Sequence, residues 1–301
     1  LKEYQGGNIS KMKKKWLWLI LSLLIIELGV VAYFFVRPFE PKTVRPSTDT
    51  SSVKLMETSL TTSESQPEEE EPSWIESDSE ISFPILMYHS LAESEGNSLK
   101  VPPAEFKEHM QWLKDNDYYT LTPEEAYTVL TENKKPAEKI VWITFDDGYL
   151  NNYTEGFPIL KELEMKATIN FITSKLGSEY YFSLEQMKEM AASNVVNIES
   201  HTVSHLDLNT LDDGMINSEL KDSKEWFDTE LNQETSLLCY PAGRYDERVI
   251  QAAEANGYKM AVTTEPGYAS HSDGLFTLKR VRVSPGYNGE AFGQFLTASQ
   301  N

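Results

Sequence analysis

Over residues 81–301, short apolar runs alternate with segments whose apolar residues recur every three or four positions. The first pattern is typical of buried strands and the second of amphipathic helices. The run KIVWITF at 139–145 is the clearest strand. Strands are predicted at 83–88, 139–145, 167–172, 195–199, 236–240, 258–262 and 276–283, and helices at 104–114, 123–130, 153–163, 184–192, 212–230 and 246–256.

Repeated alternation of strand and helix predicts a parallel sheet covered by helices. Seven or eight repeats in about 220 residues favour a sheet that closes on itself, so we predict an α/β fold with a (β/α) barrel. In such barrels the chemistry lies at the carboxyl ends of the strands. Polar residues able to do chemistry should therefore follow the strands directly.

Residues 16–36 form an apolar stretch with a single charge, Glu27. At about 1.5 Å per residue this stretch spans about 30 Å, the thickness of a bilayer core. Four lysines lie within 11–15, so the positive-inside rule predicts a signal-anchor at 16–36, with residues 1–15 in the cytoplasm and the rest outside. The membrane is then a partner of the N-terminal helix.

The alternative is a cleaved signal peptide, but such peptides have a shorter apolar region that ends in a small-x-small site. Glu27 costs about 2.5–3.5 kcal/mol at mid-membrane, which the other residues outweigh. Met12, followed by three lysines, is typical of a natural start, so we expect residues 1–11 to be an artefact of the chosen start. Residues 37–80 are rich in Ser, Thr, Pro and Glu and predict a disordered linker before a catalytic domain at 81–301.

The whole chain has 301 residues, is 40% hydrophobic and carries a net charge of −20. That composition excludes a wholly disordered chain, and the acidity argues against binding of nucleic acid through bulk electrostatics. A single cysteine excludes an intramolecular disulfide and a Cys-rich zinc site, so a metal would be held by histidine and carboxylate. The composition indicates no oligomeric state.

Candidate chemistry follows the predicted strands. Asp146 and Asp147 come after 139–145, and His201 and His205 come after 195–199. Neighbouring residues at a strand end point to opposite sides, so Asp147 can bind a metal while Asp146 acts as a general base. Histidines four apart share one face of a helical turn.

Asp147, His201 and His205 thus predict a hydrolytic site for Zn²⁺, with Co²⁺, Ni²⁺ and Mn²⁺ as alternatives. Taken alone, Asp-Asp-Gly is often only a turn, and a spaced histidine pair is often structural. Because the Asp-Asp-Gly motif and the histidine pair both follow strands of one predicted barrel, the metal site is the favoured interpretation. Structural roles are expected for other candidates: His109 in the first helix, His271 in a polar loop and Cys239 in a strand.

The motifs TFDDG at 144–148 and HTVSH at 201–205 resemble the signature of the polysaccharide deacetylases, the NodB-like carbohydrate esterases of family 4. The resemblance extends over about 81–290. It implies a distorted barrel of about seven strands that removes acetyl groups from N-acetylglucosamine polymers or O-acetylated xylan. It also implies that Asp146 is the base and that Asp147, His201 and His205 hold the metal.

The third motif of the family, Arg-Pro-Pro-Tyr/Phe-Gly, is replaced here by CYPAG, with Cys239 at the arginine position. The arginine of the family braces the base, so Arg244 or Arg280 would have to replace it. The resemblance gives the Ala242 N–H as the oxyanion donor. Tyr240, like Tyr149 and Trp142, would line a sugar groove or pack in the core.

A subgroup similar to poly-N-acetylglucosamine deacetylases begins its domain with Met-Tyr-His and has a Tyr-Pro-x-Gly third motif. Met87–His89 and Tyr240–Gly243 match both features. In that subgroup the early histidine replaces the late acid histidine, which is absent from 276–283. His89 is then the candidate general acid, with His271 as the substitute.

We therefore expect a membrane-anchored N-deacetylase outside a bacterial cell, with a Gram-positive envelope as the favoured setting. Its partner would be an N-acetylated polysaccharide: peptidoglycan, an attached glycopolymer or poly-N-acetylglucosamine. Two alternatives stay open: an O-acetyl esterase on the same site, and a catalytically silent wall-binding module, which the missing third-motif arginine would favour.

Overall fold

The computed structural model describes residues 73–299. The predicted cytoplasmic segment, the predicted membrane span at 16–36 and most of the predicted linker lie outside these residues. Within 73–299, no helix combines the length and the apolar character that a bilayer crossing requires.

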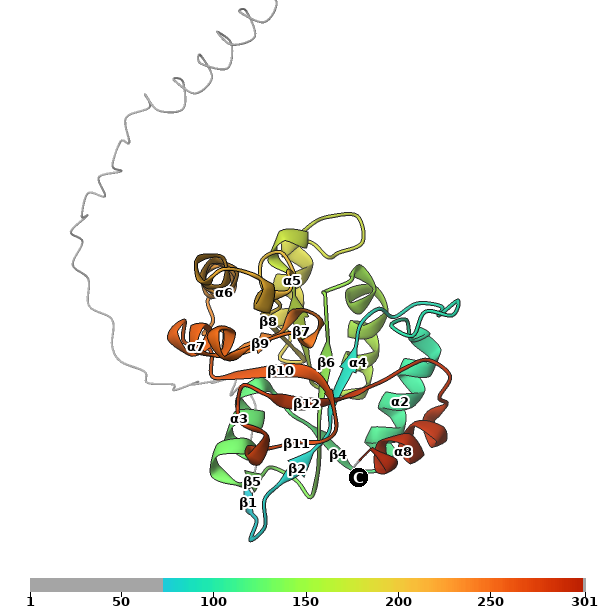
Figure 1. The fold of residues 1–301 in the computed structure, drawn as a ribbon. Coiled ribbons are helices and arrows are strands. Elements are labelled where there is room, and N and C mark those ends of the chain that lie inside the picture. The colour runs from blue at the N-terminus through green and yellow to red at the C-terminus, as the bar shows by residue number, and fades with distance from the viewer. Residues whose placement is uncertain (1–72, 300–301) are drawn as a thin grey trace, which may run out of the picture. The chain divides into compact units, whose positions relative to one another are not determined.

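Seven parallel strands form a closed barrel, which confirms the fold class (Figure 1). Their order is β3-β12-β10-β9-β8-β7-β6, and β3 closes the ring by pairing with the second half of β6. A further strand, β4 (Tyr118–Thr120), pairs with the first half of β6. The barrel strands are β3 (Ile85–Tyr88), β6 (Lys139–Phe145), β7 (Ala167–Phe171), β8 (Val196–Ser200), β9 (Leu237–Cys239), β10 (Met260–Pro266) and β12 (Leu278–Arg282).

Helices lie around the barrel, with α2, α4 and α8 on one side and α6 and α7 on the other (Figure 1). The helices are α2 (Pro103–Asp115), α3 (Pro123–Glu132), α4 (Phe157–Leu163), α5 (Leu184–Ala191), α6 (Asp213–Leu231), α7 (Glu247–Ala255) and α8 (Gly289–Ala298). The predicted cap of α3 is present, because the Thr122 hydroxyl accepts a hydrogen bond from the Glu125 N–H.

The sequence pattern missed α8, which packs on α2. Its glycine at position 293 weakens the helical signal, since glycine disfavours the interior of a helix. The structure explains this residue: a Cβ on Gly293 would lie 2.2 Å from Cε2 of Trp112 on α2. Close approach of the two helices therefore takes precedence over local helix propensity.

Alternation along the strands separates two apolar layers. Outward side chains such as Leu86, Ile143 and Val281 pack under the helices. Inward side chains such as Trp142 and Leu278 fill the barrel near the amino ends of the strands. Continuing the inward row of β6 toward its carboxyl end leads from Trp142 through Thr144 to Asp146. The apolar plug thus occupies one end of the barrel and leaves the other end for polar residues.

The folded domain begins earlier than predicted, because residues 73–80 are part of it. β1 (Ile75–Glu76) pairs with β5 (Lys134–Lys135), and β2 (Ser82–Phe83) pairs with β11 (Ala269–Ser270). The side chain of Asn133, the C-cap of α3, fastens this segment. It donates to the carbonyls of Ser77 and Ser79 at 2.8 and 3.1 Å and accepts from the Ile81 N–H at 3.0 Å.

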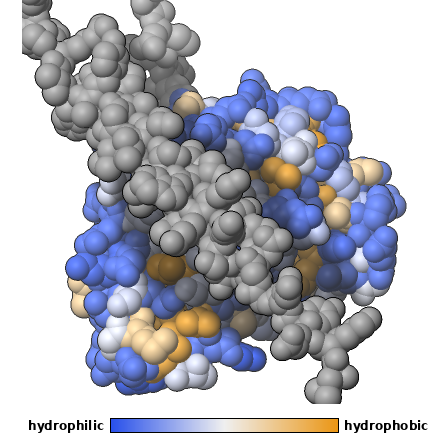
Figure 2. Space-filling view, turned by 90° about the horizontal axis from the view of Figure 1, so that it is seen from above, coloured by the Kyte–Doolittle hydropathy of each residue, from blue (hydrophilic) through white to orange (hydrophobic). Residues whose placement is uncertain are grey.

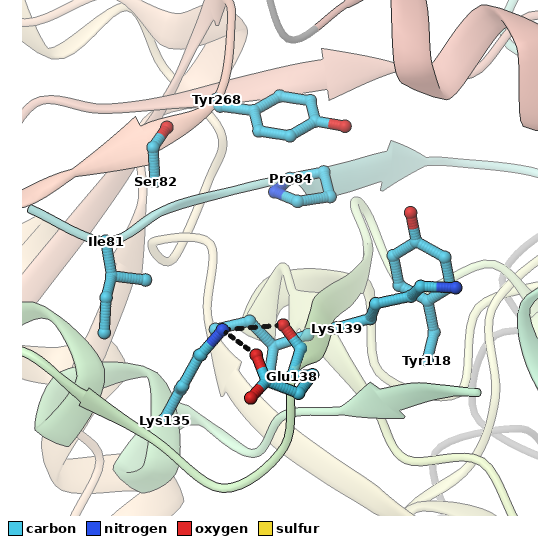
Figure 3. A pocket seen from close by; sticks show the side chains of 9 residues that line it. Ile81, Ser82, Pro84, Tyr118, Lys135, Glu138, Lys139 and Tyr268 are labelled. Carbon is cyan, nitrogen blue, oxygen red and sulfur yellow. Dashed lines mark hydrogen bonds and ion pairs between the residues drawn. The ribbon is translucent and has the colours of Figure 1, made fainter. Parts of the chain in front are cut away.

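A pocket of about 170 Å³ lies beside this segment, near the amino ends of β3 and β6. Tyr118, Lys139 and Tyr268 line it together with Lys135, whose ammonium group donates to the carbonyl and the carboxylate of Glu138 (Figure 3). This pocket is at the end of the barrel opposite to the carboxyl ends of the strands. It is therefore separate from the predicted chemistry.

A buried hydrogen-bonded chain connects β3 to α2 and to the segment before α8. Nε2 of His109 lies 2.7 Å from the Tyr287 carbonyl, and Nδ1 lies 3.1 Å from the Tyr88 hydroxyl. A carbonyl only accepts, so Nε2 carries the proton and Nδ1 accepts from Tyr88. Burial lowers the pKa of His109 from 6.5 to about 4. His109 is therefore a structural residue, as expected, and it is neutral at pH 7.

Replacing Asn133 with alanine is expected to lower the free energy of unfolding by about 2 kcal/mol, because two half-buried hydrogen bonds and one exposed hydrogen bond to residues 77–81 are lost. Asn232→Ala is the matched control. Both asparagines cap a helix with φ of 52°, but only Asn133 fastens another segment. Urea unfolding would measure both variants, and equal losses of stability would contradict the role of the fastened segment.

His109 also predicts a dependence of stability on pH. Its folded-state pKa lies below the unfolded-state value, so the unfolded state binds the extra proton and stability falls as pH drops from about 6.5 to about 4. The expected contribution to that fall is about 3 kcal/mol. In His109→Gln the fall between pH 7 and pH 4.5 should be smaller by most of that amount in urea unfolding. An identical fall in both proteins would exclude this role.

Candidate active site

Four strand ends bring the predicted chemistry to one end of the barrel. His89 follows β3, Asp146 and Asp147 follow β6, and the histidine pair at 201 and 205 follows β8. Pro241–Gly243, the segment with the candidate oxyanion donor, follows β9. Because parallel strands present their carboxyl ends on the same side, residues far apart in the sequence become neighbours here.

Asp147, His201 and His205, the three candidate metal ligands, lie close together. Oδ1 of Asp147 lies 3.5 Å from Nε2 of His201 and 3.6 Å from Nε2 of His205. Tetrahedral ligands at about 2.0–2.1 Å from Zn²⁺ are separated by about 3.3 Å. The distances from Asp147 to both histidines are thus close to the spacing that a small divalent cation requires, and the donor set of two imidazoles and one carboxylate fits such an ion.

The histidine pair is not on a helical turn, and this part of the prediction is wrong. Residues 201–207 form an irregular loop, and Thr202 and His205 have positive φ angles of 66° and 57°. The carboxylate of Glu219 on α6 supports the loop by accepting from the N–H groups of Val203 and Ser204 at 3.0 and 2.7 Å. Two strained residues and one buried glutamate therefore bring the two rings together.

His201 is oriented by the backbone of β9. Its Nδ1 lies 2.7 Å from the carbonyl of Cys239, which fixes the proton on Nδ1 and leaves the lone pair of Nε2 free for a cation. Asp146, His201 and Cys239 also lie within reach of one another. Burial raises the pKa of the Cys239 thiol, however, and Arg280 holds both carboxylate oxygens of Asp146. The cluster with Asp147 is the better cation site.

Asp146 is a buried carboxylate paired with Arg280 on β12. The guanidinium donates from Nη1 to Oδ1 at 2.8 Å and from Nη2 to Oδ2 at 2.7 Å. Asn170 on β7 donates to the same Oδ1 at 2.9 Å. Burial alone would raise the pKa of Asp146, but the charge and hydrogen bonds of Arg280 hold it far below its usual range. Asp146 is therefore ionised at any ordinary pH.

The sequence left open whether Arg244 or Arg280 would hold Asp146, and in the structure it is Arg280. The other candidate, Arg244, is exposed and pairs with Asp207. Sequence reasoning missed Asn170 and Glu219 altogether. Asn170 lies on the inward row of β7 with Thr168, so a polar residue at an inward strand position was a usable signal.

His89 and His271 are separated by the length of the barrel. Nε2 of His89 lies 3.9 Å from Oδ2 of Asp146. Nδ1 of His271 instead lies 2.9 Å from the carbonyl of Leu130 at the end of α3. Burial lowers the pKa of His89, and the charges of Asp146 and Asp147 partly oppose that effect. Of the two candidates for a general acid, only His89 faces Asp146.

Tight backbone turns present the remaining polar groups. Ala242 is exposed with φ of 51°, and its N–H makes no hydrogen bond within residues 73–299. Asp147 has φ of 72°, and Gly148 follows with φ of 83°. A Cβ at Gly148 would lie 2.0 Å from Cδ2 of Phe171, so only glycine fits. A free amide and a fixed carboxylate thus face the same end of the barrel.

The predicted sugar-groove aromatics divide into two groups. Trp142 and Tyr240 are fully buried, and Trp142 donates from Nε1 to the Thr168 hydroxyl at 2.8 Å. Tyr149 is half-buried and stacks on Tyr181 with ring centroids 5.4 Å apart. Of these three predicted residues, only Tyr149 is in a position to contact a ligand directly.

Known proteins resemble the chain in sequence. A family model described as polysaccharide deacetylase matches residues 133–261. YxkH of Bacillus subtilis (strain 168), which carries a polysaccharide deacetylase name, is 52% identical over 229 residues, covering 76% of this chain and 81% of that protein. A poly-beta-1,6-N-acetyl-D-glucosamine N-deacetylase of Staphylococcus epidermidis is 29% identical over 200 residues, covering 61% and 68%.

A solved structure is similar as well. The Streptococcus pyogenes deacetylase PplD in complex with acetate superposes with a TM-score of 0.70 at 40% identity, covering 72% of this chain and 99% of that chain. The matched family segment contains the aspartate pair and the histidine pair, but it contains neither His89 nor Arg280. The two side chains that face Asp146 from β12 and from the end of β3 thus come from outside the segment that the family model matches.

Arg280→Met is expected to lower the free energy of unfolding by about 3–5 kcal/mol at pH 7, because it leaves the Asp146 charge buried without a partner. The depressed pKa of Asp146 means that its ion pair stabilises the wild-type fold above the ordinary value of 3.8. In the variant Asp146 can protonate, so the loss should shrink toward pH 4.

Arg244→Met is the matched control for that variant. It removes an exposed ion pair with Asp207, which is worth less than about 1 kcal/mol. Urea unfolding of both variants at pH 7 and pH 4, with a chelator present, makes the comparison. Similar losses in the two variants, or a loss in Arg280→Met that does not change with pH, would refute the assignment.

Proposed function

The chain belongs to the polysaccharide deacetylase family of enzymes, and from this premise we propose that it is a metal-dependent hydrolase that removes N-acetyl groups from a polysaccharide outside the cell. The observation that carries the proposal is the triangle of Asp147, His201 and His205 beside the ionised Asp146. The three candidate ligands, the proposed base Asp146 and the imidazole of His89 all lie at one end of the barrel.

A divalent cation held by Asp147, His201 and His205 would activate a water molecule and polarise the acetamide carbonyl. Asp146 accepts the proton of the attacking water, for which its fixed charge and orientation prepare it. The Ala242 N–H donates to the carbonyl oxygen as negative charge develops there. The carbon–nitrogen bond then breaks, and acetate and a free amine leave.

His89 supplies the proton that the departing nitrogen requires. Its lowered pKa makes it neutral at pH 7, so it must gain a proton before it can act as an acid. Asp146 takes up a proton from water in the preceding step, and its Oδ2 lies 3.9 Å from Nε2 of His89. Transfer from Asp146 through His89 to the amine balances the reaction without any other donor.

The argument for a silent wall-binding module loses its support. It depended on Cys239 at the arginine position of the third motif, but Arg280 braces Asp146 from β12. The acetate in the PplD complex is the product that deacetylation would release, which favours acetyl hydrolysis here. The name of the S. epidermidis relative favours an N-acetylglucosamine polymer among the possible substrates.

We also propose attachment to a bacterial membrane through residues 16–36, with the catalytic domain outside. The described domain begins at β1, which pairs beside the amino end of β6, whereas the site is at the carboxyl end. A tether that enters at β1 thus joins the domain on the side away from the site. This arrangement suits an enzyme that acts on wall or extracellular polymer.

Acetate release tests the proposed function. The metal-free protein should release none from N-acetylglucosamine oligomers or purified cell wall, and Zn²⁺ should restore release. Asp146→Asn should lower kcat at least about 100-fold, since it removes the base. Release from an O-acetylated polymer, measured in parallel, distinguishes an esterase. Release that survives both the chelator and Asp146→Asn would overturn the proposal.

Variants of His89 and His271, the two candidate general acids, form a matched pair for a second test. His89→Gln should lower kcat about 100-fold or more, because the leaving amine is no longer protonated. His271→Gln, at the other end of the barrel, should keep the wild-type rate. If both variants, or neither, lost activity, His89 would not be the acid.

A further inference from the structure

Two buried asparagines beside the candidate site each leave a polar atom unpaired. The face of the molecule shown in Figure 2 is largely hydrophilic, with hydrophobic residues in small separate patches, so it offers no broad apolar surface. Among residues 73–299, three buried side-chain polar atoms have no hydrogen-bond partner: Oδ1 of Asn152, Oδ1 of Asn170 and the hydroxyl of Tyr240. A buried polar atom without a partner costs free energy, so these residues need an explanation.

Asn170 and Asn152 contact the site in the same way. The amide nitrogen of Asn170 donates to Oδ1 of Asp146 at 2.9 Å, and the amide nitrogen of Asn152 donates to the carbonyl of His89 at 2.8 Å. A carboxylate and a carbonyl only accept, so each contact fixes the amide group with its oxygen facing away. In both asparagines the contact with the candidate base or acid therefore takes precedence over pairing of the amide oxygen.

The neighbouring Asn151 holds the two residues that follow His89. Its Oδ1 accepts from the N–H of Leu91 at 3.0 Å, and its Nδ2 donates to the hydroxyl of Ser90 at 2.8 Å. Leu91 is itself buried, and a Cβ on Gly156 would lie 3.0 Å from its Cδ1. Asn151 and Asn152, which we call the asparagine pair, thus fasten three consecutive residues of the segment after β3.

The backbone of the stretch 146–152 places the asparagine pair opposite residues 88–91. A π-helical turn, Asn152–Gly156, begins directly after this stretch and leads into α4. Such turns are rare and often lie at functional sites. At the other end of the stretch, the N–H of Asp146 donates to the carbonyl of Tyr88 at 2.9 Å. One short stretch therefore contains the candidate base and also holds the segment that carries the candidate acid.

We propose that Asn151 and Asn152 are positioning residues that hold the imidazole of His89 facing Asp146. This inference rests on the proposed function, in which His89 protonates the leaving amine. His89 lies after the end of β3, so no strand pairing sets its position and the hydrogen bonds of its segment must do so. Misplacement of a catalytic group by about 1 Å can cost up to about 100-fold in rate.

Two substrates with different leaving groups test this role in the metal-loaded full chain. Asn152→Ala should lower kcat for acetate release from the pentamer of N-acetylglucosamine about tenfold, because the leaving amine needs a proton. The rate with para-nitrophenyl acetate should stay within about twofold, because nitrophenolate leaves without a proton. Asn256→Ala is the matched control: its amide also donates two hydrogen bonds, at the end of α7, and both rates should stay unchanged.

Further variants separate positioning from a general structural role. Asn151→Ala should show the same selective loss, whereas Asn151→Asp should restore the rate, because its carboxylate can accept from both the Leu91 N–H and the Ser90 hydroxyl. In His89→Gln, adding Asn152→Ala should cause little further loss, since the residue that it positions is already absent. A further tenfold loss there, an equal loss on both substrates, or wild-type rates in both alanine variants would overturn the inference and leave deacetylation intact.

Hydrogen exchange followed by mass spectrometry separates this inference from the proposed function, because it needs no turnover. Faster exchange of the amides of residues 89–101 in both alanine variants, with exchange in 201–206 unchanged, supports the asparagine pair even if no acetate is released. Unchanged exchange in 89–101 would overturn its role, whether or not acetate is released. An equal increase in both segments would also overturn it, because the pair would then support the whole end of the barrel.

Discussion

The pairing of Asp146 with Arg280 is the constraint on which the rest of the site depends. Both side chains are almost completely buried, and either charge alone would be costly in the interior. Arg280 satisfies its remaining donors within the barrel: Nε donates to the Thr263 carbonyl at 2.6 Å, and Nη1 also reaches the Thr144 hydroxyl at 3.2 Å. One guanidinium thereby ties β12, β10 and β6 together around the base. An ion pair of this kind adds little net stability but fixes geometry, which is what a general base requires.

Residues at the carboxyl end of the barrel, next to this rigid interior, have strained backbone conformations. Asp147, Thr202, His205 and Ala242 all have positive φ, although none of them is glycine. Such conformations cost free energy and persist only where surrounding contacts enforce them. Here the enforcing contacts are a buried glutamate, a backbone carbonyl and the close packing of Phe171 against Gly148. The strained residues supply two of the three proposed metal ligands and the candidate oxyanion donor.

The sequence was sufficient to predict the barrel and to predict which aspartates and histidines would lie together at its carboxyl end, and physical reasons explain what it missed. Strands such as 139–145 have both faces buried, so continuous apolar runs mark them well. Helix α8 was missed because its glycine at 293 serves a contact with Trp112 that no local pattern encodes. The segment 73–80 looks like linker by composition, since its attachment depends on hydrogen bonds to Asn133, on the pairing of β1 with β5 and on a single packed aromatic residue, Trp74, rather than on a run of apolar residues. The choice between Arg244 and Arg280 required the closed barrel, because Arg280 reaches a base 134 positions away.

The strands whose pairing closes the barrel also position three residues of the candidate site. Strand β3 pairs with both β12 and β6, so it forms the seam at which the ring closes. Arg280 lies on one strand of that seam, His89 directly follows the second, and Asp146 directly follows the third. The proposed metal ligands instead follow β6 and β8, inside the segment that the family model matches. A chain with an open seam could still gather Asp147, His201 and His205, but the proposed base Asp146 would lose Arg280 and the proposed acid His89 would be displaced. The proposed cation site is therefore separable from the proposed base and acid, which depend on the contact between the two ends of the domain.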